Sequence, residues 1–344
     1  MAYSQRNKKV RVPVVDSNNV PLMPTSCSRA RRWIKRGEAT YFWKKGIFCI
    51  RLNREPSGRV MQDIAVGIDP GSKREGYTVK SAAHTYLNIL SDAATHVKSK
   101  VETRRNMRRG RWFRKTPCRS NRMNRARGSL PPSTKARWQL KLNVVNFLSK
   151  IYPINIISVE DIAAVTKEGQ RRWNKNFSPL EVGKKWFYDI LRQRFTLHII
   201  SGWDTYNERL RLGLAKTSSK LSKVFSAHCV DSWALANMVV GGDIADDNTS
   251  MLYIKPIQFH RRQLHVLQYA KKHVRKSYGT TLSMGLKRGS LVKHHKQGLC
   301  LVGGSSRGKI SLHKVDDNSR LSRTINPEDC RFLSYNSWNF VWIT

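Results

Sequence analysis

The stretch IAVGIDPG, residues 64–71, decides the fold of this chain, because it joins a short apolar run to an acid and a tight turn. An apolar run of this length that is bounded by Pro and Gly is typical of a buried strand. The sequences EGYTVKSA (residues 75–82) and HTYLNIL (residues 84–90) predict two further strands directly after it. Three consecutive strands predict the opening meander of a mixed sheet.

The same reasoning extends the sheet along the chain. INIISVE (residues 154–160) and TLHIIS (residues 196–201) predict two more strands, with a helix over residues 179–194 between them. A strand, helix, strand order predicts parallel additions to the meander. Another helix follows the LPPS sequence, with Ser133 as its expected N-cap. The predicted fold class is therefore α/β, a mixed sheet with helices on both faces.

Smaller elements flank this sheet. Residues 10–52 alternate apolar and polar positions around a helix-like stretch, which predicts a small N-terminal α+β module ending near the linker NREPSGR (residues 53–59). Beyond about residue 250 the chain has short strand-like runs separated by glycine turns. This pattern predicts a small C-terminal β-barrel or sandwich.

Four polar residues interrupt apolar elements. Asp69 and Glu160 each end a strand run, and His228 and Asp231 lie in the apolar helix-like run SAHCVDSWALA (residues 226–236). His228 and Asp231 are three positions apart, so a helix projects both from one face. Hard divalent cations take oxygen ligands, and two-metal phosphodiester cleavage uses carboxylates from separate elements. The pattern therefore predicts metal binding by the three acids, with His228 orienting or deprotonating the attacking water.

Each of these residues also has a simpler interpretation when it is taken alone. Asp69 before Pro-Gly is compatible with a turn start, and Glu160 followed by Asp161 with an ordinary helix start. His228 is compatible with a core or surface histidine, and Asp231 with a partner for a nearby arginine. Their joint occurrence in a strongly basic chain favours the metal-site interpretation.

Charge indicates the class of partner. The chain has 64 Lys and Arg against 23 Asp and Glu, a formal net charge of +41 and a sequence pI near 10.6. This balance predicts extended, salt-dependent contact with nucleic-acid phosphates. No apolar run approaches the roughly 20 residues of a membrane-spanning helix, the N-terminus has no hydrophobic signal region, and the six cysteines are widely separated. We expect a protein of the reducing cytoplasm without a membrane partner.

The basic residues are densest between residues 104 and 127, where eleven Lys or Arg occur without an acid. Doublets of arginine recur at i, i+4, so a helix would gather like charges that repel unless phosphates neutralise them. A solvated basic helix or arm is the simpler alternative. The density of charge and the interleaved Met107, Trp112 and Phe113 favour a helix that clamps nucleic acid.

These residues resemble a known family. GIDPGSKREGYTV (residues 67–79), VEDIAA (residues 159–164) and SAHCVDSWALA resemble, in this order, the three separated segments of a RuvC-type nuclease with the RNase H fold. VPLMPTSCSRARRWIKRGEA (residues 20–39) resembles the PLMP segment that opens IscB proteins, and RRNMRRGRWFRK (residues 104–115) resembles their arginine-rich bridge helix. PIQFHRRQLHVLQ (residues 256–268) resembles the segment after the third nuclease motif.

The absence of one domain distinguishes which subgroup of these proteins the chain resembles. IscB proteins carry an HNH nuclease between the second and third RuvC segments, but residues 161–227 contain a single histidine, His198, and no cysteine. The chain therefore resembles IsrB, the relative that lacks HNH. The resemblance implies a PLMP module over residues 1–58, RuvC segments over 59–97, 131–205 and 206–250, a bridge helix over 98–130, and a C-terminal β domain over 251–344 that interacts with RNA and the target-adjacent motif.

The resemblance implies an RNA-guided DNA endonuclease that nicks the non-target strand with RuvC alone. Its implied partners are a long omega-type guide RNA and double-stranded target DNA with a short adjacent motif, bound by a monomer in the prokaryotic cytoplasm, at the nucleoid. Asp69, Glu160 and Asp231 would hold Mg²⁺ at a two-metal site, with Mn²⁺ as an alternative, and His228 would position water or ligate metal. The implied RNA-binding residues are Arg104, Arg105, Arg108, Arg109, Arg111, Arg114, Lys115 and Arg119.

Two other functions remain open. A guide-independent, structure-selective nuclease of Holliday-junction type would use the same acids without RNA, although such enzymes are compact and need neither the inserted basic helix nor an added β domain. A catalytically silent RNA-binding protein would keep the basic helix and lose the site, which the intact set of four residues disfavours.

Overall fold

The computed structural model describes residues 10–115, 130–165, 176, 178–219, 222–242, 248–257, 267–268, 273–274 and 282–343 of the 344-residue chain. The chain forms two compact units. The first comprises Met1–Phe42, Phe48–Leu252 and Ile343–Thr344, and the second comprises Trp43–Ile47 and Tyr253–Trp342. No helix within the described ranges is both long and apolar enough to cross a membrane.

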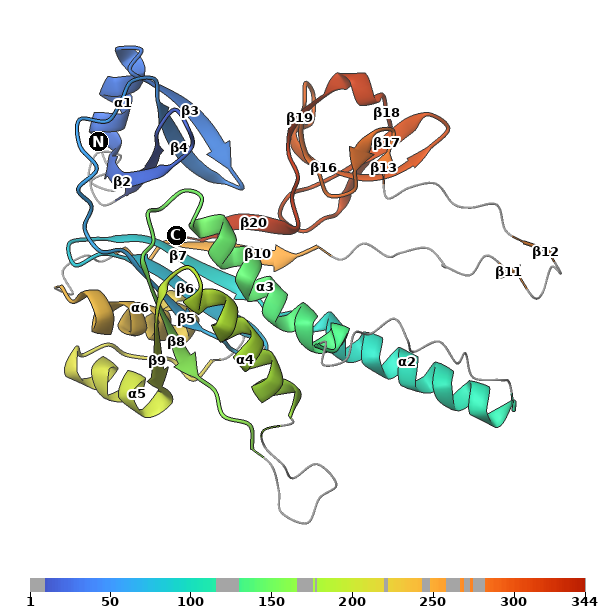
Figure 1. Ribbon diagram of the computed structural model, residues 1–344. Coiled ribbons are helices and arrows are strands. Elements are labelled where there is room, and N and C mark those ends of the chain that lie inside the picture. Colours follow the sequence, from blue (N-terminus) through green and yellow to red (C-terminus); the bar gives the residue numbers. More distant parts are fainter. Residues whose placement is uncertain are drawn as a thin grey trace. The chain divides into compact units, whose positions relative to one another are not determined.

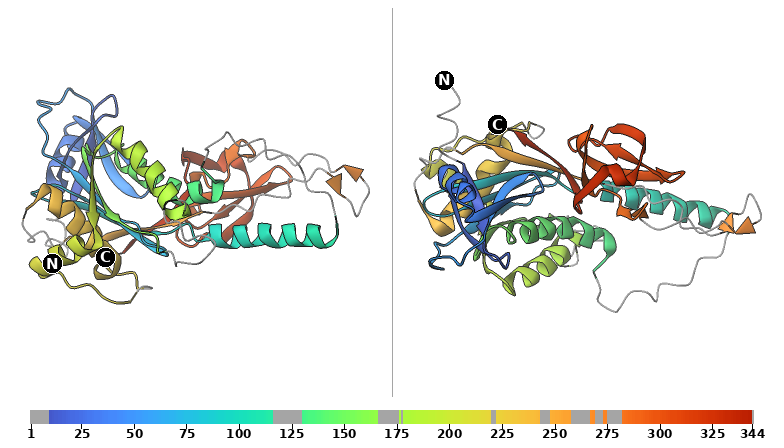
Figure 2. Two further views of the ribbon diagram at one scale, coloured as in Figure 1. Left: turned by 60° about the horizontal axis from the view of Figure 1, so that its bottom comes forward. Right: turned by 90° about the horizontal axis from the view of Figure 1, so that it is seen from above.

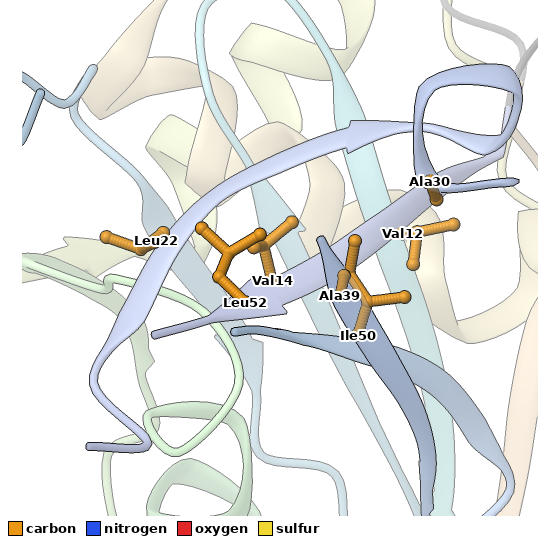
Figure 3. Close-up of a cluster of buried hydrophobic side chains, with 7 residues drawn as sticks. All are labelled: Val12, Val14, Leu22, Ala30, Ala39, Ile50 and Leu52. Carbon is orange, nitrogen blue, oxygen red and sulfur yellow. The ribbon is translucent and has the colours of Figure 1, made fainter. Parts of the chain in front are cut away.

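The first unit begins with a four-stranded sheet and one helix. The elements are β1 (Arg11–Val15), β2 (Pro21–Ser26), α1 (Cys27–Lys35), β3 (Ala39–Lys44) and β4 (Ile47–Leu52). The strands lie in the order β2-β1-β4-β3. Ser26 caps α1 by accepting a hydrogen bond from the backbone N–H of Arg29. The apolar side chains of this module form one core (Figure 3): Val12, Val14, Leu22, Ala30, Ala39, Ile50 and Leu52.

A mixed sheet forms the centre of the first unit. Five of its strands are β5 (Ala65–Asp69), β6 (Arg74–Lys80), β7 (Thr85–Asp92), β8 (Ile156–Asp161) and β9 (Thr196–Ser201). They lie in the order β7-β6-β5-β8-β9. β6 is antiparallel to β5 and β7, whereas β8 is parallel to β5 and β9 is parallel to β8. This meander with parallel additions confirms the predicted mixed α/β sheet, and its order fits an RNase H-like fold.

Helices cover both faces of this sheet (Figures 1 and 2). α3 (Pro132–Leu148) and α4 (Pro179–Arg192) pack together on one face, and α6 (Phe225–Val240), with α5 (Gly202–Arg211) against it, lies on the other. The prediction of Ser133 as an N-cap is wrong by two positions. Pro131 takes the cap position and Pro132 begins the helix, where its missing N–H costs no helical hydrogen bond.

The part of the basic stretch that the structure describes, residues 104–115, lies on α2 (His96–Phe113) and directly after it, and α2 is an exposed helix (Figure 1). Its one buried residue is Val97, which packs with Ala94 and with Leu140 of α3. Trp112 and Phe113, at its end, are each 85% exposed. This helix is therefore attached to the unit at its first turn and presents nearly all of its length to solvent.

The second unit contains a five-stranded antiparallel sheet. Its strands, in the order β18-β17-β16-β15-β19, leave β18 and β19 at the ends, so the described part is an open sheet and not the predicted barrel. These strands are β15 (Leu291–His294), β16 (Gly298–Ser306), β17 (Lys309–His313), β18 (Arg320–Ile325) and β19 (Cys330–Ser334). The other elements are β10 (Met251–Pro256), whose first two residues belong to the first unit, β11 (Leu267–Gln268), β12 (His273–Val274), β13 (Leu282–Ser283), β14 (Leu286–Lys287), η3 (Pro327–Asp329) and β20 (Trp338–Ile343).

Candidate functional site

Asp69 and Glu160 lie at the same end of two neighbouring strands. β5 and β8 are parallel and pair Ile68 with Val159, so the next positions along the two strands are Asp69 and Glu160. Parallel strands bring their carboxyl ends to one edge of a sheet. Each of the two strands is an apolar run that ends in an acid. Both carboxyls therefore lie at that edge of the sheet, as predicted.

The two acids also share the face of the sheet that α6 covers. Side chains alternate along a strand, so Asp69 and Glu160 face the same side as the residues two positions earlier. One of these, Gly67, has no side chain, and a Cβ there would overlap the backbone of Ser232 in α6. The other, Ser158, donates a hydrogen bond from its hydroxyl to the Leu235 carbonyl oxygen of α6 at 2.8 Å.

A second glycine brings α6 close to the strand ends. Gly76 of β6 pairs directly with Asp69, and a Cβ at Gly76 would overlap the His228 carbonyl oxygen. Beside this contact the Ser232 and Thr78 hydroxyls form a hydrogen bond of 2.9 Å. The helix backbone therefore lies nearer to the sheet than side chains on both strands would allow, which positions the polar residues of α6 over the acids.

The two sheet carboxyls interact directly. Burial raises the pKa of Asp69 well above its ordinary value, and the negative charges of Glu160 and Asp231 raise it further. Burial also raises the pKa of Glu160, although a hydrogen bond with Asp69 acts in the opposite direction. Two adjoining carboxyls cannot both ionise without cost. The ionised form of Asp69 is therefore disfavoured by burial and by the two neighbouring acids.

Asp231 is held by two basic side chains that the sequence did not single out. Arg209 Nε of α5 lies 2.7 Å from Asp231 Oδ1, and Lys216 Nζ, from the loop before α6, forms an ion pair with Asp231 Oδ2. Asp231 is only 2% exposed. The simpler interpretation, that Asp231 balances a nearby arginine, is therefore confirmed. Its charge nevertheless also acts on Asp69 and Glu160, so all three acids belong to one electrostatic cluster.

His228 stands one helical turn before Asp231 and is 9% exposed. The predicted i, i+3 relation on α6 is thus present, while its chemical role stays a prediction.

The acidic cluster has the donor chemistry of a divalent-cation site. Within the described residues, no group of three or more His, Cys, Asp or Glu side chains has the arrangement of a metal site. Carboxylate oxygens are nevertheless the donors that Mg²⁺ and Mn²⁺ prefer, and three carboxyls interact here. The Lys216 ammonium neutralises Asp231. These residues therefore fit a hard cation that competes with Lys216 for the Asp231 carboxylate.

The predicted RNA-binding residues lie on α2 and directly after it. Arg104, Arg105, Arg108 and Arg109 are exposed on the helix. Arg111 is partly exposed, Arg114 and Lys115 follow the end of the helix, and Arg119 lies outside the described residues. An exposed helix of this charge is suited to contact a polyanion rather than to pack in a core.

The fold and the site define an α/β protein with a buried acidic cluster and an exposed cationic helix. The family described as RRXRR protein matches residues 12–173, a little under half of the chain. The matched segment includes α2, Asp69 and Glu160, but ends before His228 and Asp231. This similarity relates the N-terminal half of the chain to that family. No curated protein matches the chain significantly.

Two solved structures are similar to parts of the chain. T. thermophilus RuvC in complex with Holliday junction substrate has 12% sequence identity and a TM-score of 0.28, and the match covers 51% of this chain and 90% of that chain. The yeast mitochondrial Holliday junction resolvase Ydc2 has 14% identity and a TM-score of 0.28, with 52% and 78% covered. Identities and TM-scores this low carry no inference about function.

Proposed function

We propose that this protein is an RNA-guided DNA endonuclease that nicks the non-target strand at a metal-dependent site. The observation that carries the proposal is the convergence of Asp69, Glu160 and Asp231, from three separate segments, in one electrostatic cluster. A chain with a formal net charge of +41 attracts a polyanion to such a cluster. A single nuclease centre cuts one strand.

In this proposal Asp69, Glu160 and Asp231 hold Mg²⁺, or Mn²⁺, by their carboxylate oxygens. The bound cations supply Lewis-acid stabilisation at the phosphoryl oxygens and lower the pKa of a bound water. Asp69 would have to be ionised to hold a cation, because metal ligands are deprotonated. His228, one turn before Asp231, accepts a proton from the attacking water.

The guide RNA is the second part of the proposal. The exposed arginines of α2 contact its phosphates, which fixes the position of the RNA but carries no sequence information. Base pairing between the RNA and one DNA strand then supplies the sequence specificity. The protein acts as a monomer with a long bound RNA on double-stranded DNA that carries a short adjacent motif.

Purification of the full chain tests RNA dependence. We expect a discrete RNA to copurify, and we expect the complex to nick a supercoiled plasmid that carries the complementary sequence. Sequencing the bound RNA and relaxation of the plasmid provide the two measurements. A protein that carries no discrete RNA and cuts branched DNA unaided is instead a junction-type nuclease.

Two adjacent acids of β8 provide a matched test of the site. Glu160 faces α6, whereas Asp161 is exposed and forms an ion pair with Lys184 at 2.8 Å. We expect Glu160→Gln to reduce nicking to background with RNA binding intact. Asp161→Asn should keep the rate within about twofold, because an exposed pair contributes little. Equal loss of nicking in the two variants, or none in either, contradicts the assigned site.

A further inference from the structure

The first turns of α5 carry an exposed pair of stacked aromatic side chains. Trp203 is 69% exposed and Tyr206 is 43% exposed. Their ring centroids lie 5.7 Å apart, with an angle of 29° between the ring planes. The two residues are three positions apart, so they are neighbours on the helix surface. A tryptophan that packs on a second exposed ring, and not into a core, leaves a large apolar face open to solvent.

The stacked pair is connected to the acidic cluster along the same helix. The Arg209 guanidinium lies 5.6 Å from the Tyr206 ring centroid, and Arg209 Nε lies 2.7 Å from Asp231 Oδ1. Gly202, Tyr206 and Arg209 have the i, i+4, i+7 spacing of a single helix flank. A Cβ at Gly202 would lie 3.2 Å from Glu160 Oε1, so this flank faces the acids. Tyr206, one member of the aromatic pair, is therefore linked through Arg209 to the acidic cluster.

The two exposed rings are not the side chains that pack α5 against its neighbours. The helix packs through Thr205, which is 2% exposed, while Trp203 stands on the solvent side. Trp203 and Arg209 are six positions apart, which corresponds to about 9 Å along the helix. A planar group on the rings is thus close to any phosphate that reaches the acids. A chain with a formal net charge of +41 attracts a polyanion, and exposed stacked rings suit the planar bases that a nucleic acid carries.

We propose that Trp203 and Tyr206 form a stacking platform for one unpaired DNA base beside the scissile phosphate. This inference rests on the proposed function, because it assigns the substrate of that site. Stacking on an aromatic ring accepts any base, since every base has a π-face. A base within a duplex has both faces covered by its neighbours, so the platform selects a displaced single strand over a duplex.

Fluorescence of 2-aminopurine tests the platform without cleavage. The full chain with its copurified RNA is titrated, in EDTA, with a single-stranded thymidine oligonucleotide that carries one 2-aminopurine. We expect quenching on binding, because the base stacks on the indole. Trp203→Ala should abolish the quenching and weaken binding by about tenfold. Trp203→Phe should retain most of the affinity, and Leu210→Ala, at a 62% exposed position of the same helix, should match the wild type.

The outcomes separate the platform from the proposed function. Equal quenching and affinity in wild type and Trp203→Ala overturn the platform. Quenching that depends on Trp203 in a protein that nicks no DNA supports the platform and contradicts the nuclease proposal. An oligoribonucleotide of matching sequence serves as the comparison: if RNA shows the dependence on Trp203 and DNA does not, the assignment of the occupant to DNA is wrong.

Discussion

The two faces of the central sheet both bury charged side chains, but they balance them differently. On the α3 face, Glu75 accepts a hydrogen bond from the Lys141 ammonium and another from the Tyr77 hydroxyl, each at 2.5 Å. On the α6 face, three carboxyls meet two basic side chains, and Asp69 has a pKa raised well above its ordinary value. The first face carries a satisfied ion pair, and the second carries an excess of acid.

This difference distinguishes the Glu75 ion pair from the cluster of acids that we propose as the functional site. Glu75 is 1% exposed, and each of its two carboxyl oxygens accepts a hydrogen bond, so its polar atoms are satisfied within the fold. On the α6 face, burial and the charges of Glu160 and Asp231 instead raise the pKa of Asp69, so its ionised form is disfavoured. Perturbed acids that cluster in this way are typical of sites that do chemistry.

Removal of Lys141 tests the balanced face and has the largest expected effect on stability. Lys141→Met leaves Glu75 buried without its ion-pair partner, and we expect a loss of about 3–5 kcal/mol in the free energy of unfolding. Urea denaturation of the purified protein measures this change. The double variant Lys141→Met with Glu75→Gln removes both charges and should recover most of the loss.

The other face should respond in the opposite sense. Asp69→Asn removes one of the mutually repelling carboxyls, so the free energy of unfolding should stay the same or rise in metal-free buffer. The contrast between the two faces is wrong if Asp69→Asn destabilises the protein as much as Lys141→Met does.

The acids of the α6 face are predictable from the sequence, whereas the basic side chains that pair with Asp231 are not. A carboxylate at the end of an apolar strand is unusual in so basic a chain, which marks Asp69 and Glu160. Arg209 and Lys216 carry no such mark, because 64 Lys and Arg are equivalent candidates until the fold brings two of them to Asp231. Only the three-dimensional contacts identify these partners.

The fold shows the same limit. The strands of the central sheet are predictable because apolar runs bounded by turn residues form buried strands. The orientation of helix α5 cannot be predicted in this way. Its apolar residues Trp203, Tyr206 and Leu210 have i, i+3, i+7 spacing, but this row faces solvent instead of the core. Of this exposed row, we assign only Trp203 and Tyr206 to DNA.

Lys216 offers a sharper test of the unbalanced face, with a moderate expected effect. Lys216→Met removes one of the two cations from Asp231, so the cluster has more uncompensated negative charge. We expect Mg²⁺ to stabilise this variant more than the wild type, by about 1 kcal/mol, or about 2–4 °C in melting temperature. Thermal denaturation over a Mg²⁺ titration measures the difference.

Lys184→Met is the matched control for this experiment. Lys184 also forms ion pairs with acids, but these are Asp161, at the exposed end of β8, and Glu181 of α4. Its removal should leave the Mg²⁺ response unchanged. An equal increase in both variants indicates a general effect of lost positive charge and contradicts competition at Asp231.

Asp16, in the N-terminal module, is another buried acid, and its pH dependence gives the smallest expected effect. It is 1% exposed. Burial would raise its pKa, but hydrogen bonds from the backbone of Val20, from Arg59 and from the backbone of Asn18 outweigh burial and lower the pKa below 3.8. A carboxyl with a lowered folded-state pKa contributes stability above pH 3.8, and this contribution is lost as the pH falls through the folded-state pKa.

Asp16→Asn should therefore reduce the free energy of unfolding by about 1–2 kcal/mol at neutral pH, because it removes the charge from these hydrogen bonds. Below the folded-state pKa the wild-type carboxyl is also neutral, so the two proteins should converge. Urea denaturation at neutral pH and again under acidic conditions measures the convergence. A difference that persists in acid assigns the effect to side-chain geometry rather than to charge. In that case Asp16 is not a further example, in the N-terminal module, of a buried acid whose charge is satisfied by hydrogen bonds.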